Sequence, residues 1–385
     1  MHTNMVNLGT LIKPAKVERC KDEIYPVLSM TMHDGLVFQN EKFKKTIASK
    51  DTSDYKIVKR NQLVISFPID EGVLATQRII DAGIVSPAYG VWDVNTKKIM
   101  PLFLEMSLRC NRALDYYKSH LRGSTARRRS LPTPTLLAFT ISLPTLTEQQ
   151  EILNIIDKAR SLVEFRKKQL QQLDELVKAR FVEMFGTTGN QVPLIDCVWF
   201  QEGPGVRSID FTNNGTILLT GSNINDNIIS FGYKSDRHIS NELASGKYAH
   251  FMCDKDDVLV VSSAIDPEKF DKKVVVVDTD KKYCLNTGII RFKPNKQYLT
   301  LGYFREFLKT DYFKRQVISE MRGIAQMHFG PSHLKQMTIL LPNSIEKQTE
   351  FESFVKQIDK SKVVVQKALD EAQTLFDSLM QEYFG

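Results

Sequence analysis

One short pattern occurs twice in this chain and decides how the rest is interpreted. The first copy is Phe139-Thr-Ile-Ser-Leu-Pro144, followed by Glu148-Gln-Gln150, and the second is Met337-Thr-Ile-Leu-Leu-Pro342, followed by Glu346-Lys-Gln348. Pro144 and Pro342 are 198 residues apart (342 − 144). Upstream of each copy lies a further matched pair, Asp115-Tyr-Tyr-Lys118 with Arg122-Gly123 and Asp311-Tyr-Phe-Lys314 with Arg322-Gly323. The chain therefore consists of two halves of about 200 residues that share one plan.

Each half ends in a segment whose apolar residues recur in alternating steps of four and three. Eight of ten such positions from Ile152 to Met184 are apolar, as are nine of the ten positions 199 residues later. A period of 3.5 residues is typical of coiled-coil helices. We expect the two helices to pair, because neither buries its apolar stripe alone, and we expect the pair to be antiparallel. The predicted seam consists of Ile152, Ile156, Leu170, Leu173, Val177, Phe351, Val355, Leu369, Phe376 and Leu379.

The first long helix has recognisable start and stop signals. Thr147 and Gln150 fit a capping box, in which a hydroxyl and the side chain three residues later satisfy free backbone amides, and Gly186 is expected to end the helix. At 1.5 Å per residue, residues 147–185 would extend ~58 Å, which is more than a domain needs for its own core. Such a helix is expected to act as a spacer.

The segments before the helices are expected to be globular. They combine β-rich runs, such as 61–67, 257–262 and 273–278, with one helical stretch near residues 101–121 and another near 298–321. The predicted fold class is α+β, with two mixed α/β globular domains separated by two long antiparallel coiled-coil helices in a pseudo-two-fold repeat. The predicted divisions are a first domain at 1–146, a helix at 147–186, a second domain at 187–343 and a helix at 344–385.

Composition excludes several classes of protein. Apolar residues make up 42% of the chain and charged residues 25%, which excludes a disordered or fibrous chain. The net charge of +7 permits a polyanionic partner without requiring one. The five cysteines are far apart and form no C-x-x-C pair, so we expect neither a disulfide framework nor a zinc site, and we expect a reducing cytoplasm. No targeting segment, membrane span or membrane partner is expected.

The sequence offers little catalytic chemistry. Ser86-Pro-Ala-Tyr89 partly matches the tetrapeptide with which amino-methyltransferases hold a target base, but it lacks the second proline, and no glycine-rich cofactor loop accompanies it. Asp278-Thr-Asp280 and Asp266-Pro-Glu268 could imitate the carboxylate cluster of a nuclease, although solvated turns explain both more simply. The histidines lack metal-binding spacing. We therefore expect no catalytic residue and no bound metal.

Polyanion recognition is the chemistry that the residues favour. Arg122-Gly-Ser-Thr-Ala-Arg-Arg-Arg129 carries four guanidinium groups, whose planar donors match phosphate oxygens or the guanine edge. A solvated basic turn would explain this loop alone, but its counterpart, 322–328, lies at the same place in the second half. The candidate DNA-binding residues are Arg122, Gly123, Ser124, Arg127, Arg128, Arg129, Arg322, Gly323, Gln326 and His328.

A resemblance to a known family rests on the helix and on the segments beside it. Leu143-Pro144 with Glu148-Gln-Gln150, Ile156-Asp-Lys158, Leu173-Asp-Glu-Leu176 and Phe181-Val-Glu-Met-Phe-Gly186 resemble the central helix of specificity subunits of type I restriction-modification enzymes. Gly83-Ile-Val-Ser-Pro-Ala-Tyr89 is similar to a segment of the same family. The resemblance covers essentially the whole chain.

The resemblance implies a non-catalytic subunit with two target-recognition domains, each reading one half of a bipartite site in double-stranded DNA. It also implies antiparallel helices that set the half-site spacing and dock two methyltransferase subunits, through which restriction (translocase) subunits join. No cofactor is expected in this chain, whereas S-adenosylmethionine, ATP and Mg²⁺ are expected on the partner subunits. Two alternatives stay open: a stand-alone DNA-modifying enzyme, either a nuclease or a methyltransferase, and a coiled-coil assembly protein that binds no DNA.

Overall fold

The structure is a computed structural model that describes residues 4–21, 23–32, 34–42, 51–122, 131–186, 189–232, 234–319 and 327–385. The chain divides into two compact units. The first comprises Met1–Lys167 and Gln366–Gly385, and the second comprises Lys168–Val365. Each unit therefore contains one globular half and a part of each long helix. In the part of the chain that the structure describes, no helix is long and apolar enough to cross a membrane.

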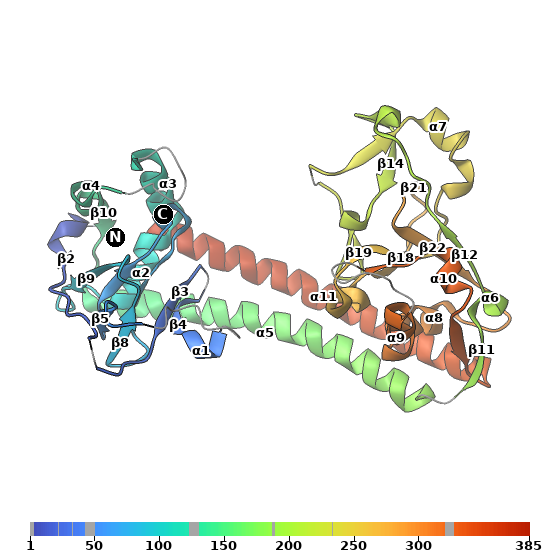
Figure 1. Cartoon of the computed structure of the whole chain (residues 1–385), viewed down its shortest axis with the longest axis horizontal. Helices are drawn as coiled ribbons and strands as arrows, with labels where there is room; N and C mark the ends of the chain where they lie inside the picture. Colours follow the sequence, from blue (N-terminus) through green and yellow to red (C-terminus); the bar gives the residue numbers. More distant parts are fainter. Residues whose placement is uncertain are drawn as a thin grey trace. The chain divides into compact units, whose positions relative to one another are not determined.

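An antiparallel sheet of four strands forms the centre of the first globular half (Figure 1). Its order is β2 (Ile12–Pro14), β9 (Gly90–Val94), β6 (Leu63–Ile65) and β7 (Leu74–Thr76). Successive side chains of a strand point to opposite faces, so the apolar residues of β6 pack into two different cores. Leu63 joins the core that contains Phe103, whereas Val64 packs with Leu28 and Leu36 on the other face.

The second globular half repeats this sheet. The strand order is β12 (Val198–Glu202), β22 (Ile289–Pro294), β18 (Val258–Val261) and β20 (Val274–Val276), again antiparallel throughout. The register repeats as well. Leu63 lies opposite Trp92 and Thr76, and Val258 lies opposite Phe292 and Val276. The two sheets therefore share both order and register.

Helices follow each sheet in the same order. The first half has α2 (Pro101–Arg109) and α3 (Asn111–His120), and the second has α8 (Leu301–Phe307) and α9 (Asp311–Ser319). The sequence predicted one helical stretch in each place. The structure corrects this to two, since Cys110, between α2 and α3, has an extended backbone with φ −70° and ψ 159°.

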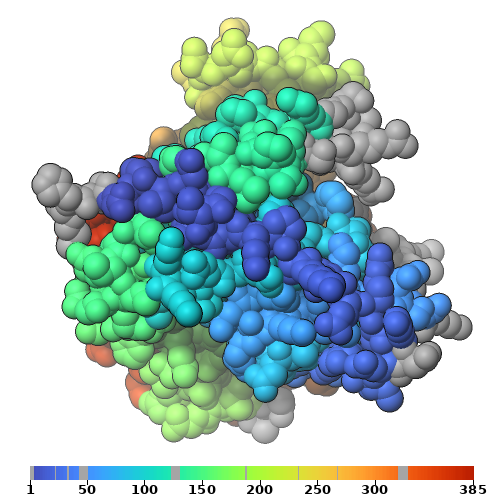
Figure 2. Space-filling model, turned by 90° about the vertical axis from the view of Figure 1, so that its left-hand side faces the viewer, coloured from blue at the N-terminus to red at the C-terminus, as the bar shows by residue number. Residues whose placement is uncertain are grey.

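The twice-used Thr-Ile motif forms a strand that pairs with the first strand of its own half. In the first half β1 (Met5–Asn7) pairs antiparallel with β10 (Thr140–Ser142). Figure 2 shows this face, with the N-terminal segment in blue beside green residues near 140. In the second half β11 (Asn190–Pro193) pairs antiparallel with β24 (Thr338–Leu341). In each half, the first strand is therefore paired with the strand that directly precedes the long helix.

The remaining elements are short. Those of the first half are β3 (Leu28–Thr31), β4 (Gly35–Phe38), α1 (Gln39–Lys42), β5 (Lys56–Lys59), β8 (Ala82–Val85) and α4 (Thr133–Ala138). Those of the second half are α6 (Leu194–Cys197), β13 (Phe211–Thr212), β14 (Thr216–Leu219), β15 (Ile224–Asn225), β16 (Ile228–Ile229), β17 (Arg237–Ile239), α7 (Asn241–Ser245), β19 (Ser263–Ile265), β21 (Tyr283–Leu285), β23 (Met327–His328) and α10 (Pro331–Leu334). A second sheet, β13-β17-β14-β21, covers its own small core around Leu218 and Tyr248.

The two long helices are α5 (Leu146–Phe185) and α11 (Ile345–Phe384), each of 40 residues. The predicted cap of α5 is wrong. Thr145 is the capping residue: its hydroxyl accepts the N–H of Glu148, and its own N–H donates to the Glu148 carboxylate at 2.8 Å. The hydrogen bonds from Thr145 hold the pKa of Glu148 below its ordinary value, and a carboxylate suits the positive end of the helix, so Glu148 completes a capping box better than Gln150, whose amide donates to Asn154 instead.

The helices pair antiparallel within each unit. In the second unit Lys362 contacts Asp174 at 2.5 Å and Arg180 contacts Glu350 at 3.0 Å, so residue numbers fall along α11 as they rise along α5. In the first unit the Arg160 guanidinium lies over the Phe376 ring, 5.9 Å from its centroid. Five of the seam residues named above are buried, namely Ile152, Ile156, Val177, Phe351 and Val355, and the other five are half-buried.

Candidate nucleic-acid interface

Only the edges of the two basic loops fall within the described residues. Arg122 is exposed and follows α3, and His328 is exposed on β23. The other loop residues named from the sequence lie outside the described residues, namely Gly123, Ser124, Arg127, Arg128, Arg129, Arg322, Gly323 and Gln326. The described elements on either side correspond in chain order, since each segment follows the second helix after the sheet and precedes the closing strand of its half.

In the second half, the end of the loop is fastened to the central sheet. His328 on β23 lies opposite Ser263 on β19, the strand that follows β18 directly. The N–H of Phe329 donates to the carbonyl of Ser262 at 3.0 Å, and Phe329 is fully buried. The position of the exposed His328 side chain is therefore set by a buried anchor rather than by the loop itself.

Two further loops meet at this anchor. The N–H of Ser262 donates to the carbonyl of Gly288 at 2.8 Å, and a Cβ added to Gly288 would lie 3.0 Å from the Cβ of Ser263. Gly288 has a φ of +82°, which glycine adopts without strain. A Cβ on Gly221 would lie 3.0 Å from the side chain of Val261. The loops after β14, β18 and β21 therefore converge at the end of β18.

These loops carry hydroxyl groups. Ser263, which lies opposite His328, is half-buried, and Ser222, Thr287 and His328 are exposed. Hydroxyls donate and accept, so they can bond either base edges or phosphates. Sequence reasoning missed Ser222, Ser263 and Thr287, because each is an isolated small polar residue in a turn and only the fold brings them together.

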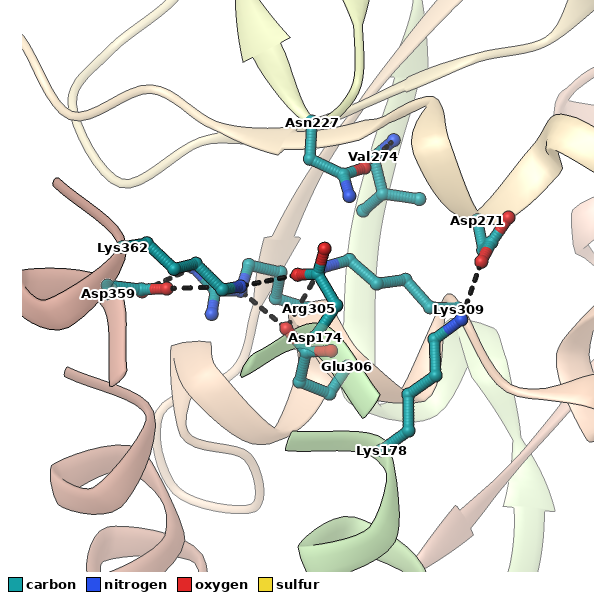
Figure 3. Close-up of polar contacts among 10 residues, drawn as sticks. All are labelled: Asp174, Lys178, Asn227, Asp271, Val274, Arg305, Glu306, Lys309, Asp359 and Lys362. Carbon is teal, nitrogen blue, oxygen red and sulfur yellow. Dashed lines mark hydrogen bonds and ion pairs between the residues drawn. The ribbon is translucent and has the colours of Figure 1, made fainter. Parts of the chain in front are cut away.

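A network of charges around the buried Glu306 connects the second globular half to α11, and a separate ion pair, Lys178 with Asp271 at 2.7 Å, connects it to α5 (Figure 3). Glu306 on α8 is buried and contacts Lys309 at 2.9 Å and Arg305 at 2.8 Å. Arg305 also contacts Asp359 on α11 at 3.1 Å. Burial alone would raise the pKa of Glu306, but the positive charges of Lys309 and Arg305 outweigh it and hold that pKa below its ordinary value.

The first unit does not repeat this network at the helix pair. Val163 and Arg160 stand 199 residues before Lys362 and Asp359. Val163 is buried, and Arg160 lies over an aromatic ring. The two halves thus share backbone architecture but use different side-chain chemistry where the helices pack.

The helices also carry exposed apolar residues at repeated positions. Phe165 and Val364 are 199 residues apart and are 54% and 69% exposed, and Leu176 and Leu375 have the same separation and are 47% and 49% exposed. Relative to the seam they occupy heptad positions c and g, which in an antiparallel pair lie on one side of the two helices. We name Phe165 with Leu375 the first apolar face and Val364 with Leu176 the second; each belongs to one unit.

Two of the three catalytic look-alikes have structural explanations. In Ser86-Pro-Ala-Tyr89 the N–H of Tyr89 donates to the carbonyl of Ser86 at 3.1 Å, which makes the segment a turn after β8. Asp266 accepts the N–H of Glu268 and so caps a short 3-10 helix, Pro267–Lys272. Among the described residues, no group of three or more His, Cys, Asp or Glu side chains could hold a metal ion.

The repeat in the fold coincides with a repeat of one protein family. Residues 5–175 and residues 198–372 each match the family described as type I restriction modification DNA specificity domain. The chain belongs to this family. With two such domains in tandem, it is a specificity subunit of a type I restriction-modification system. Each match covers one globular half and most of the long helix that follows it.

Solved structures with the same fold agree. A chain from a study of complex assembly and conformational transition of the type I R-M system superposes with a TM-score of 0.58 at 15% identity, covering 99% of this chain and 97% of that one. The S subunit of a type I restriction-modification system from M. genitalium gives a TM-score of 0.53 at 13% identity, covering 100% and 97%. No protein of curated function is significantly similar in sequence.

Proposed function

We propose that this specificity subunit reads a bipartite site in double-stranded DNA, with one half-site for each globular half. The observation that supports the proposal is the repeat itself, since sheet order, register, helices and loop position all recur. Phosphate contacts would supply affinity that falls with salt, and base contacts would supply sequence. Because its proposed partner is DNA, we also propose that this chain is located in the cytoplasm.

The two halves would read different sequences. In the first half the readers would be Arg122, Gly123, Ser124, Arg127, Arg128 and Arg129, whose guanidinium groups suit phosphates and guanine edges. In the second half they would be Arg322, Gly323, Gln326 and His328, and the convergence of three loops adds Ser222, Ser263 and Thr287 to them.

Selection from a DNA library tests this proposal. The full-length chain would be mixed with duplexes that contain a long randomised region, and the bound fraction would be sequenced at two salt concentrations. The expected result is two short specified blocks with an unspecified spacer between them, and affinity that falls as salt rises. One contiguous block, or binding that does not change with salt, would contradict the proposal.

We further propose that the two apolar faces dock two methyltransferase subunits, one on each face. The support is that each residue of the first face has a counterpart 199 positions away in the second, and that all four apolar side chains are exposed, which is typical of a surface that a partner covers. Restriction (translocase) subunits would join through the methyltransferases. S-adenosylmethionine, ATP and Mg²⁺ would be held by those partners, and this chain would supply recognition without catalysis.

Co-purification tests the docking proposal. Phe165→Asp with Leu375→Asp should remove one methyltransferase subunit of two, and adding Val364→Asp with Leu176→Asp should remove both. Mass measurement of the complex by light scattering would distinguish the three states. If both subunits remain bound to the fourfold variant, the faces are not the docking sites. Incubating the purified chain alone with DNA, Mg²⁺ and S-adenosylmethionine should give neither cleavage nor methylation, and either product would favour the stand-alone enzyme.

A further inference from the structure

A buried glutamine fastens the start of each long helix to the globular half that precedes it. Gln149 in the first turn of α5 is fully buried. Its side-chain oxygen accepts the N–H of Met100 at 2.8 Å, and its amide nitrogen donates to the carbonyls of Lys98 at 3.0 Å and Pro144 at 2.9 Å. Both amide protons and the oxygen are therefore used.

The same joint exists in the second half. Gln348, in the first turn of α11, is 1% exposed. Its oxygen accepts the N–H of Thr300 at 2.9 Å, and its nitrogen donates to the carbonyl of Tyr298 at 3.0 Å. Met100 and Thr300 are the residues that immediately precede α2 and α8. Each glutamine thus bonds the start of one helix to the start of another.

The neighbouring residue shows that this contact is specific to one position. Gln150 is exposed, and its amide donates only within its own helix, to Asn154 at 2.9 Å. A helix held to a domain by apolar packing alone can slide or tilt at small cost, because such contacts have little directional preference. Hydrogen bonds prefer a narrow range of angles, so the two that each glutamine makes to the segment before α2 or α8 oppose such a tilt.

We propose that Gln149 and Gln348 are positioning residues that fix the direction in which each long helix leaves its recognition domain and thereby set the spacer length between the two half-sites. This inference rests on the proposed reading of a bipartite site. Neither residue would contact DNA. Their loss would therefore change which spacers are accepted and leave the base preference inside each half-site intact.

The test measures spacer preference in the full-length chain. The half-sites selected by the wild-type chain would be placed in duplexes with the selected spacer and with spacers one and two base pairs shorter or longer. Gln149→Met and Gln348→Met remove the amide but keep the side-chain length. We expect each to reduce the preference for the selected spacer by about tenfold, whereas Gln150→Met should retain the wild-type preference.

The outcomes separate the possible roles. A parallel loss of affinity for every spacer would show a purely structural role and would overturn the inference. An unchanged spacer preference in Gln149→Met and Gln348→Met would overturn it as well and would leave the proposed function intact. A wild-type chain with no preferred spacer would contradict both.

If the methionine variants do not fold, the variant Gln149→Glu provides a second test. Its carboxylate would face two carbonyl oxygens, so the folded state would favour the protonated form, which can donate to one of them. The penalty should therefore grow as the pH rises. Spacer preference should be closer to wild type near pH ~5.5 than near pH ~8. The same preference at both pH values would overturn the inference.

Discussion

The ammonium group of Lys362 in α11 lies 2.5 Å from the carboxylate of Asp174 in α5, at a seam position that the first unit fills with buried Val163. Lys362 also lies 3.9 Å from Asp359, which joins the pair to the buried charges around Glu306. At this position of the helix pair, the first unit is therefore stabilised by apolar contacts and the second by ion pairs.

Removing the Glu306 charge should destabilise the second unit. Glu306→Gln would remove the only acidic partner that the structure gives the half-buried Lys309 and one of the two that it gives Arg305, and we expect a loss of about 3 kcal/mol in the free energy of unfolding. Urea unfolding at neutral pH measures it. Glu371→Gln on an exposed position of α11 is the matched control and should change little. Equal stability of Glu306→Gln and wild type would contradict the importance of the network.

The same carboxylate predicts a dependence on pH. Because the pKa of Glu306 is lower in the folded chain than in the unfolded one, its ionised form stabilises the fold above the ordinary glutamate pKa. That contribution should be lost as the pH falls below about 4.5 toward the lower folded pKa. Unfolding curves across this range should show a steeper loss for wild type than for Glu306→Gln. Identical slopes would contradict the prediction.

The seam can be tested with two leucines on one helix. Leu173 is half-buried against the core of the second unit, and Leu176 is exposed on the second apolar face. Leu173→Asp should lower the free energy of unfolding by about 2–4 kcal/mol, because its carboxylate would lose water without gaining a partner. Phe376→Asp should do the same in the first unit. Leu176→Asp should leave stability nearly unchanged, and a comparable loss there would show that the two positions were assigned wrongly.

The helices and the repeat could be predicted from sequence because they are periodic. The 3.5-residue spacing and the repeated Leu-Pro motif predicted both long helices and two α+β halves. The family match confirms this fold. The capping residue of α5 was predicted two positions too late, since Thr145 and Thr147 both start an acceptable capping pattern and only the Glu148 contacts distinguish them.

The interface was less predictable for a physical reason. Ser222, Ser263 and Thr287 lie in three separate turns, and only the fold brings those turns together, through the contact of Gly221 with Val261 and the bond from Ser262 to Gly288. Gln149 was part of a motif that the sequence displayed, but nothing in its spacing indicated a buried side chain bonded to Lys98 and Met100. Contacts between distant segments depend on topology, which a pattern along one chain does not contain.

The cysteines provide a check on the cores. All five thiols are buried, and burial raises the pKa of Cys253 to about 12. The thiolate is the reactive form, so the native chain should react very slowly with iodoacetamide near neutral pH and should react at all five positions once unfolded. Mass spectrometry counts the adducts. Rapid labelling of Cys253 in the native chain would contradict the burial of that core.

The central claim is that each globular half reads its own half-site, and sequencing of methylated DNA tests it most directly. The assembled enzyme would be prepared with wild-type subunit, with Arg127, Arg128 and Arg129 replaced by Ala, and with Gln326→Ala and His328→Ala combined. We predict that the first set relaxes or weakens only the first half-site, by about 1–3 kcal/mol for each lost base contact, and that the second set affects only the other half-site. If both sets alter the same half-site, or if neither alters any, the account of the two readers is wrong.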